Sequence, residues 1–112
     1  EVDHPMQIVA ESVVHTADMS GAEVIVVIGD NPKIAQTISA FRPDTPIYAF
    51  SDKKEVVREL KLSYAVHARM NGNNKQTLLD EEYVADDAIV IVQAKDDAAE
   101  TFDIQVTTVE NL

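Results

Sequence analysis

The run Val24–Ile28 constrains the fold more than any other part of this sequence. All five of its residues, VIVVI, are apolar and β-branched, which suits them to the pleated surface of a strand. A strand without a polar side is buried on both faces, as is typical of parallel sheets that helices cover. Five residues are far too few to span a bilayer. We therefore predict a strand at 23–28, inside a helix-covered sheet.

Helical and strand patterns alternate along the rest of the sequence, with turn residues between them. The expected elements are a helix that Asp3 caps and Gly21 ends, the strand at 23–28, a helix from Pro32 to Phe41, a strand at 46–50, a helix that Ser51 caps and that contains Val56–Leu60, a strand at 63–67, a short helix at 76–84, and strands at 88–92 and 102–109.

The last of these segments differs from the others because its apolar and polar residues alternate. We expect Phe102, Ile104 and Val106 to face inward and the polar residues between them to face solvent, as in an antiparallel edge strand. Strands that alternate with helices imply right-handed crossovers and a mostly parallel sheet. The prediction is one α/β domain over residues 1–112, a three-layer α/β/α fold with a doubly wound five-stranded sheet.

The charge of the chain excludes several classes of function. A formal net charge of −11 opposes binding to nucleic acid and to anionic membranes, which depends on Lys and Arg. The absence of cysteine excludes disulfides and thiolate sites. From Lys75 onward there are ten carboxylates and two lysines, which fits a solvated acidic face, a cation-binding patch or adaptation to a salt-rich cytosol.

The N-terminal residues lack the pattern of a signal peptide, so we expect a cytoplasmic protein.

A resemblance to a known family emerges from two segments. The strand at 22–27 is followed, after a tight loop and a helix, by Phe41-Arg42-Pro43-x-x-Pro46-Ile47-x-Ala49. This spacing resembles the C-terminal domain of pyruvate kinase, over residues 4–67 and again, in register, over 84–110.

The resemblance implies a sheet order of 3-2-1-4-5 with the fifth strand antiparallel at the edge. It also implies a regulatory and subunit-contact domain, in an enzyme that transfers a phosphoryl group from phosphoenolpyruvate to ADP. The Mg²⁺- and K⁺-dependent chemistry of that family belongs to a separate β/α barrel, so we expect no cofactor and no kinase activity in this chain alone. The implied partners are the remainder of a pyruvate kinase or a second copy of the chain, in a homo-oligomer joined through residues 102–109.

The loop after the first strand departs from the family pattern. Where the family binds a sugar phosphate, this loop is rich in Ser, Thr and Gly, whose hydroxyl and N–H groups hold the phosphate. Here the loop is Gly29–Ile34, without a hydroxyl; Asp30 adds a carboxylate that repels phosphate, and Pro32 removes an N–H donor. The segment between the third and fourth strands is also shorter than is usual in the family. We expect that fructose bisphosphate does not bind appreciably.

A candidate site for a small anionic effector still lies where the first two strands end, because ligands of open α/β sheets bind beyond the carboxyl ends of the strands. Its residues combine turn donors with lysines that enter helices: Gly29, Asp30, Asn31, Lys33, Ser51, Lys53 and Lys54. The alternative is ordinary helix capping with solvent-exposed lysines.

No arrangement of residues indicates catalysis or a metal site. The histidines, at 4, 15 and 67, are scattered over different elements, and the paired carboxylates Asp86-Asp87 and Asp96-Asp97 lie in turns. The alternative to a regulatory module is a free-standing binding protein for an anionic metabolite. Because the sequence starts at Glu1 rather than Met, we expect further residues before it, from a tag or a longer protein.

Overall fold

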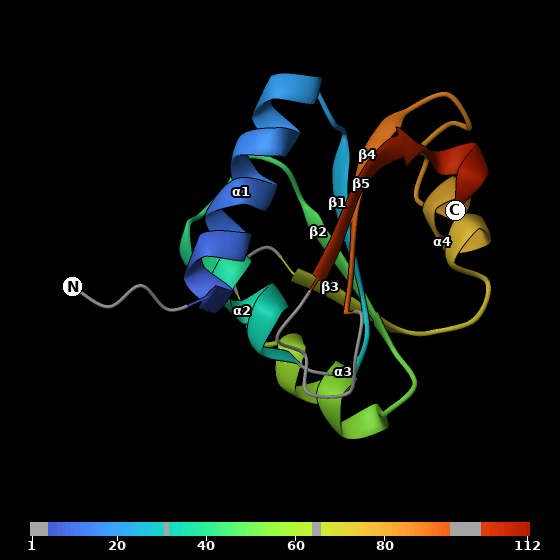
Figure 1. Cartoon of the computed structure of the whole chain (residues 1–112). Helices are drawn as coiled ribbons and strands as arrows, with labels where there is room; N and C mark the ends of the chain where they lie inside the picture. The colour runs from blue at the N-terminus through green and yellow to red at the C-terminus, as the bar shows by residue number, and fades with distance from the viewer. Residues whose placement is uncertain (1–4, 31, 64–65, 95–101) are drawn as a thin grey trace.

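The structure, a computed structural model, describes residues 5–30, 32–63, 66–94 and 102–112 (Figure 1). In chain order its elements are α1 (Pro5–Ser20), β1 (Val24–Ile28), α2 (Pro32–Ala40), β2 (Ile47–Ser51), α3 (Lys54–Leu60), β3 (Val66–Met70), α4 (Asn74–Asp80), β4 (Ala88–Ala94), β5 (Phe102–Thr108) and the 3₁₀ turn η1 (Val109–Asn111). The helix cap expected from Asp3 lies outside the described residues.

The five strands form one sheet in the order β3-β2-β1-β4-β5, as expected. The neighbours within β3-β2-β1-β4 run parallel, and β5 runs antiparallel to β4 at the edge. Strand β1 lies at the centre, with Ile25 paired to Ile47 on one side and to Val90 on the other. This position explains why β1 carries no polar residue: both of its faces and both of its edges are covered.

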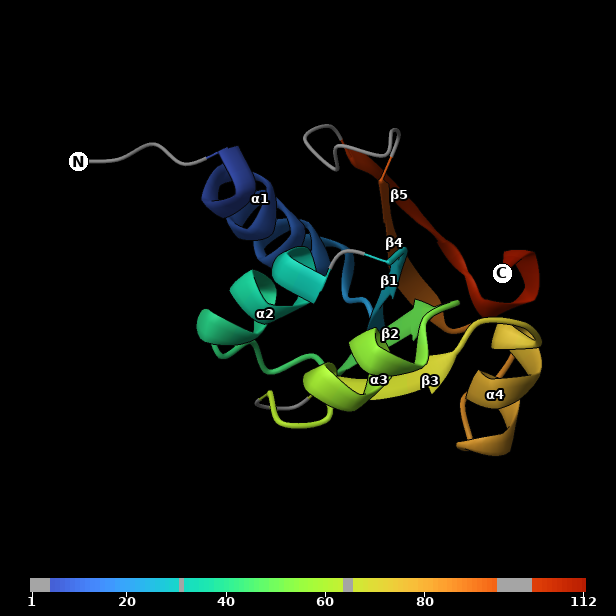
Figure 2. The same ribbon diagram turned by 90° about the horizontal axis from the view of Figure 1, so that it is seen from below.

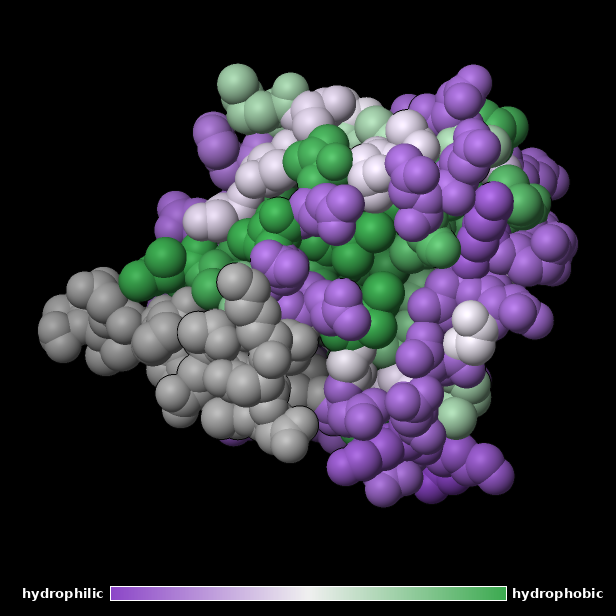
Figure 3. Space-filling model, turned by 45° about the vertical axis from the view of Figure 1, so that its right-hand side comes forward, coloured by the Kyte–Doolittle hydropathy of each residue, from purple (hydrophilic) through white to green (hydrophobic). Residues whose placement is uncertain are grey.

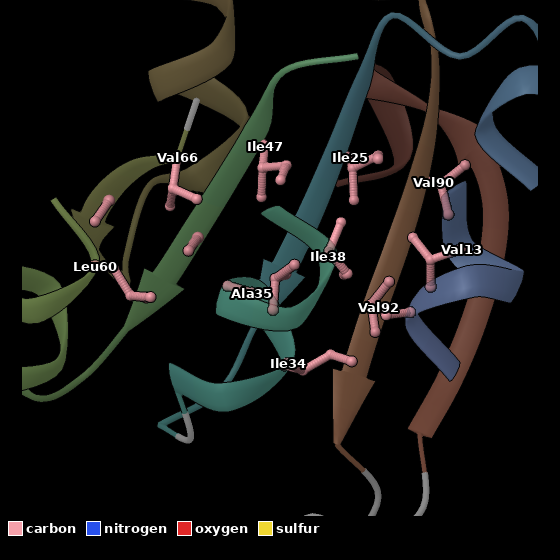
Figure 4. Packing of buried hydrophobic residues seen from close by; sticks show 14 of the residues in the cluster. Val13, Ile25, Ile34, Ala35, Ile38, Ile47, Leu60, Val66, Val90 and Val92 are labelled. Carbon is pink, nitrogen blue, oxygen red and sulfur yellow. The ribbon is translucent and has the colours of Figure 1, made fainter. Parts of the chain in front are cut away.

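The larger core lies between the sheet and the helices α1, α2 and α3. Figure 2 shows these three helices along one side of the sheet. In Figure 4 their side chains point toward apolar residues of the strands: Val13 from α1, Ile34, Ala35 and Ile38 from α2, and Leu60 from α3 lie against Ile25, Ile47, Val66, Val90 and Val92. These are the positions that the helical spacing of the sequence predicts to face inward.

The opposite face of the sheet is covered by α4 and by the chain end. Leu78 of α4 and Val109 are fully buried there against Val24, Phe50 and Ile89. A helix layer on each face gives the three-layer α/β/α arrangement that the sequence predicts. This second layer is thinner, because α4 has only seven residues and buries only Leu78 completely.

The predicted third strand, at 63–67, overlaps β3 at 66–67, and its residues 64 and 65 lie outside the described residues. Residues 63–67 were expected, but β3 begins at Val66, and the backbone N–H of Ser63 donates to the carbonyl of Leu60 as part of the turn that ends α3. Within β3, Val66 and Ala68 are buried while His67 is exposed. The strand therefore alternates between buried and exposed residues, as an edge strand does.

Two helix starts also differ from the prediction. Ser51 does not cap α3: it is the buried last residue of β2, and α3 begins at Lys54, after Lys53, without a side-chain cap. Helix α4 begins at Asn74 rather than 76 and ends at Asp80. Glu82, with a φ of 78°, takes the left-handed conformation that stops the helix before 84.

The three apolar residues of β5 lie on the inward face, as expected, but only Phe102 is covered there. Pairing with Val90 and Val92 places Val106 and Ile104 on the helix-covered face, yet they remain 50% and 36% exposed. Only Phe102 packs against the larger core, because β5 lies at the edge where the helix layer ends. Figure 3 shows a hydrophobic patch on one face of the molecule, with hydrophilic residues scattered over it and along its right-hand border.

Candidate functional site

A small cavity lies at the carboxyl ends of the parallel strands, where open α/β sheets bind ligands. Its volume is about 210 Å³. Each of β1, β2, β3 and β4 contributes to it at or just beyond its last residues, and the lining is formed by Ile28, Gly29, Asp30, Phe50, Ser51, Asp52, Asn71 and Gln93. Ile28 and Phe50 supply apolar surface, and most of the others carry hydrogen-bonding side chains.

Asp30 connects the two loops at this cavity. One of its carboxylate oxygens, Oδ1, accepts a hydrogen bond from the Ser51 hydroxyl at 2.7 Å and another from the backbone N–H of Asp52 at 2.9 Å. The Ser51 hydroxyl oxygen in turn accepts a bond from the backbone N–H of Lys53 at 3.1 Å. The Asp30 carboxylate is thus held by two consecutive residues at the end of β2, and the Lys53 N–H in turn holds the Ser51 hydroxyl.

Backbone bonds set the strand ends at the same level. The N–H of Gly29 donates to the carbonyl of Phe50, and the N–H of Asn71 donates to that of Ser51. Gly29 has a φ of 148°, in a region that only glycine adopts without strain, and this lets the chain leave β1 toward the cavity. Asp30 follows directly, so its side chain reaches the end of β2.

The hydrogen bonds to Asp30 fix its charge. The Ser51 hydroxyl, then the Asp52 N–H and the charge of Lys53 lower the pKa of the Asp30 carboxyl below its usual value, against a smaller opposing effect of burial. Asp30 is therefore ionised at neutral pH and brings a full negative charge to the cavity. Asp52 lines the same cavity with a second carboxyl group.

The structure brings together only part of the predicted site. Gly29, Asp30 and Ser51 line the cavity, whereas Lys33, Lys53 and Lys54 do not line it and have exposed side chains. Asn31 lies outside the described residues. Five lining residues were not predicted: Ile28, Phe50, Asp52, Asn71 and Gln93. Each of them lies at or next to the end of a strand, which was the available signal. For Asn71 and Gln93 this signal required the correct ends of the third and fourth strands, which were expected at 67 and 92.

A second polar cluster lies on the α4 side of the sheet, away from this cavity. The ring of Tyr48 stacks on that of His67, with centroids 4.7 Å apart, and the ring of Tyr83 meets it edge-on at 5.9 Å. Tyr48 is only 3% exposed, so its ring is part of the core and not a surface for a ligand.

In residues 5–30, 32–63, 66–94 and 102–112, no three His, Cys, Asp or Glu side chains are grouped so that they could hold a metal ion. Among the helices of the same ranges, none combines the length and apolar character needed to cross a membrane.

Comparison with known proteins adds one match. The model of the family described as "Pyruvate kinase, alpha/beta domain" matches residues 7–104 of the chain. A search of curated protein sequences found no match.

Proposed function

The chain belongs to the pyruvate kinase alpha/beta domain family, and from this membership we propose that it is the regulatory and subunit-contact domain of such an enzyme. The observation that carries the proposal is the extent of the match, which runs from α1 through the parallel strands into β5. The phosphoryl transfer from phosphoenolpyruvate to ADP, with its Mg²⁺ and K⁺, then belongs to another part of that enzyme.

The proposal includes a changed effector loop. In the family, hydroxyl and N–H donors of this loop hold a sugar phosphate, whereas here the loop contributes the ionised carboxylate of Asp30. A phosphate entering the cavity would meet that charge and the carboxyl of Asp52. We expect fructose bisphosphate to bind only weakly, if at all, so regulation would pass through subunit contacts and not through this sugar phosphate.

The second candidate is a free-standing binding domain for a small anionic metabolite. The cavity at the strand ends favours it, since it lies where ligands of such sheets bind. The charge of Asp30 opposes it, because an anion is the least suitable ligand for a cavity lined by two carboxyl groups. We therefore prefer the domain of a larger enzyme.

The reading frame upstream of Glu1 provides the direct test. We expect it to encode a β/α barrel, and the complete product to form pyruvate from phosphoenolpyruvate and ADP, while the 112-residue chain alone forms none. The control is the complete product without Mg²⁺, which should be inactive. A frame without a barrel, combined with failure of the chain to bind any pyruvate kinase lacking its own alpha/beta domain, would overturn the proposal.

A further inference from the structure

We propose that Asp30 is an internal ligand, whose carboxylate takes the place of a bound anion and holds the loops after β1 and β2 together without an effector. The inference deepens the proposed function and rests on it for the regulatory meaning. The two hydrogen bonds that Asp30 accepts from Ser51 and Asp52, called the lock below, lie within this chain and do not depend on that function.

The donors that meet Asp30 are those that would hold an oxyanion. A single carboxylate oxygen receives the Ser51 hydroxyl at 2.7 Å and the Asp52 N–H at 2.9 Å. Hydrogen bonds to an ionised acceptor are shorter and stronger than those between neutral groups. Because the Ser51 hydroxyl gives its hydrogen to Asp30, its oxygen is available to accept the Lys53 N–H at 3.1 Å. Hydroxyl and N–H donors are thus already occupied by a group of the protein.

An external anion is at a disadvantage against this carboxylate for two reasons. The first is concentration, because a group on the same chain acts at an effective concentration that is on the order of millimolar or more. The second is charge: the anion would approach a cavity lined by Asp30 and Asp52, on a chain with a net charge of −11. The lowered pKa of Asp30 keeps the internal ligand charged at neutral pH.

The lock joins loops that the sheet alone does not hold. The last backbone hydrogen bond at this end of β1 and β2 runs from the Gly29 N–H to the Phe50 carbonyl. The one beside it, at the end of β2 and β3, runs from the Asn71 N–H to the Ser51 carbonyl. The Asp30 carboxylate extends the connection by one residue on each side, to the first residue of the loop after β2. In a regulatory domain, this arrangement corresponds to loops that stay closed whether or not an effector is present.

The test compares three forms of the chain: the natural sequence, Asp30→Ala, and Asp52→Asn as a control. The control also removes one negative charge from the cavity lining, but leaves the carboxylate of Asp30 and the backbone N–H of residue 52 in place. Amide hydrogen exchange of residue 52 reports whether the lock is closed. We expect Asp30→Ala to accelerate this exchange about tenfold or more, and Asp52→Asn to change it little after correction for the side-chain effect on intrinsic exchange.

The same three proteins are then titrated with inorganic phosphate by calorimetry. We expect measurable binding at millimolar phosphate only for Asp30→Ala, since the freed Ser51 and Asp52 donors can then hold the anion. Unchanged exchange at residue 52 in Asp30→Ala would overturn the proposal, as would equal phosphate binding by Asp30→Ala and Asp52→Asn, which would assign the effect to charge alone. If Asp30→Ala does not fold, as judged by circular dichroism, Asp30→Ser, whose shorter side chain carries no carboxylate to receive the two bonds, is measured in its place, with the same two outcomes. These measurements use the chain alone, so they can succeed or fail independently of any barrel upstream.

Discussion

The hydroxyl of Tyr48 in β2 donates a hydrogen bond to Oε1 of Glu81, the residue that follows α4, over 3.3 Å. The same ring stacks on His67 of β3 and meets the edge of Tyr83. Tyr48 therefore connects the sheet to the turn that follows α4. Because α4 has seven residues and buries only Leu78 completely, we expect the contacts of Tyr48 to add to the small attachment of this helix.

Removing the hydroxyl should cost much less than removing the ring. For Tyr48→Phe we expect the free energy of unfolding to fall by about 0.5–1 kcal/mol, the usual contribution of a single partly exposed hydrogen bond. For Tyr48→Ala we expect a loss of about 3 kcal/mol or more, because a nearly fully buried ring leaves a cavity. Urea denaturation followed by circular dichroism measures both. Equal losses in the two variants would contradict this division between the hydroxyl and the ring.

Alkaline pH should weaken the fold through the same residue. Burial, with the nearby Tyr83 and Glu81, raises the pKa of Tyr48 from 10.0 to about 12. The folded state then holds its proton more tightly than the unfolded state. The contribution of protonated Tyr48 to the free energy of unfolding is therefore complete below pH 10 and is lost between pH 10 and about 12. We expect Tyr48→Phe to lose less stability than the natural chain over this interval. Tyrosinate absorbance should show one group that titrates near pH 12; titration of every tyrosine near pH 10 would refute the prediction.

At acid pH the lock at Asp30 should open. The pKa of this carboxyl is lowered in the folded state, mainly by the Ser51 hydroxyl. Its contribution to stability is therefore present above the ordinary value of 3.8 and is lost as the pH falls from that value through the lower, folded one. The side chain is exposed, so we expect less than about 1 kcal/mol. Asp30→Asn should show a smaller decline in unfolding free energy between pH 5 and pH 2 than Asp52→Asn, the matched control; identical declines would argue against the prediction.

The central part of the fold could be predicted because its residues permit few alternatives. The run Val24–Ile28 has no polar residue and so requires cover on both faces, and β4 continues the same pattern from Ala88. The order of the strands did not follow from these patterns; it came with the resemblance to a family. Apolar patterns identify strands, but they do not say which strands are neighbours.

The third strand shows where such reasoning fails. Strand β3 has the sequence VHARM, in which only Val66 and Ala68 are buried. Two buried residues that are separated by an exposed His67 give a weak strand pattern. The prediction therefore began earlier in the sequence, where Tyr64 and Ala65 precede Val66. Edge strands bury one face only, so their boundaries are the hardest to find in a sequence.

The candidate site was located in sequence, but its central contact was not. Gly29, Asp30 and Ser51 were chosen because each follows or ends a strand. The bond between Asp30 and Ser51 depends on the register of β1 and β2, which pairs Ile28 with Phe50 and so sets the two strand ends level. Asp30 was expected to repel an anion, and the structure adds that its carboxylate receives the donors itself.

The exposed apolar residues of β5 lead to the prediction on assembly. Ile104 and Val106 are 36% and 50% exposed, on an edge strand of seven residues that contains no Pro or Lys. Such an edge is a template for pairing with another strand. We expect a two-fold dimer in which β5 pairs with its copy, since an arrangement that uses the same surface twice closes on itself. The net charge of −11 opposes association, but salt screens it over roughly 8–10 Å at physiological ionic strength.

Sedimentation of the chain at about 0.15 M salt tests this dimer, and its fraction should increase with salt as the repulsion is screened. Ile104→Lys and Val106→Lys should each shift the chain toward the monomer, because a buried ammonium group would be placed on the contact. The matched control is Leu62→Lys, which adds the same charge at a residue that is 90% exposed and follows α3, beside the opposite edge strand β3. Since all three variants change the net charge equally, only the position differs between them. A chain that stays monomeric at high micromolar concentration, or a dimer that Leu62→Lys weakens as much as Val106→Lys does, would exclude β5 as the contact.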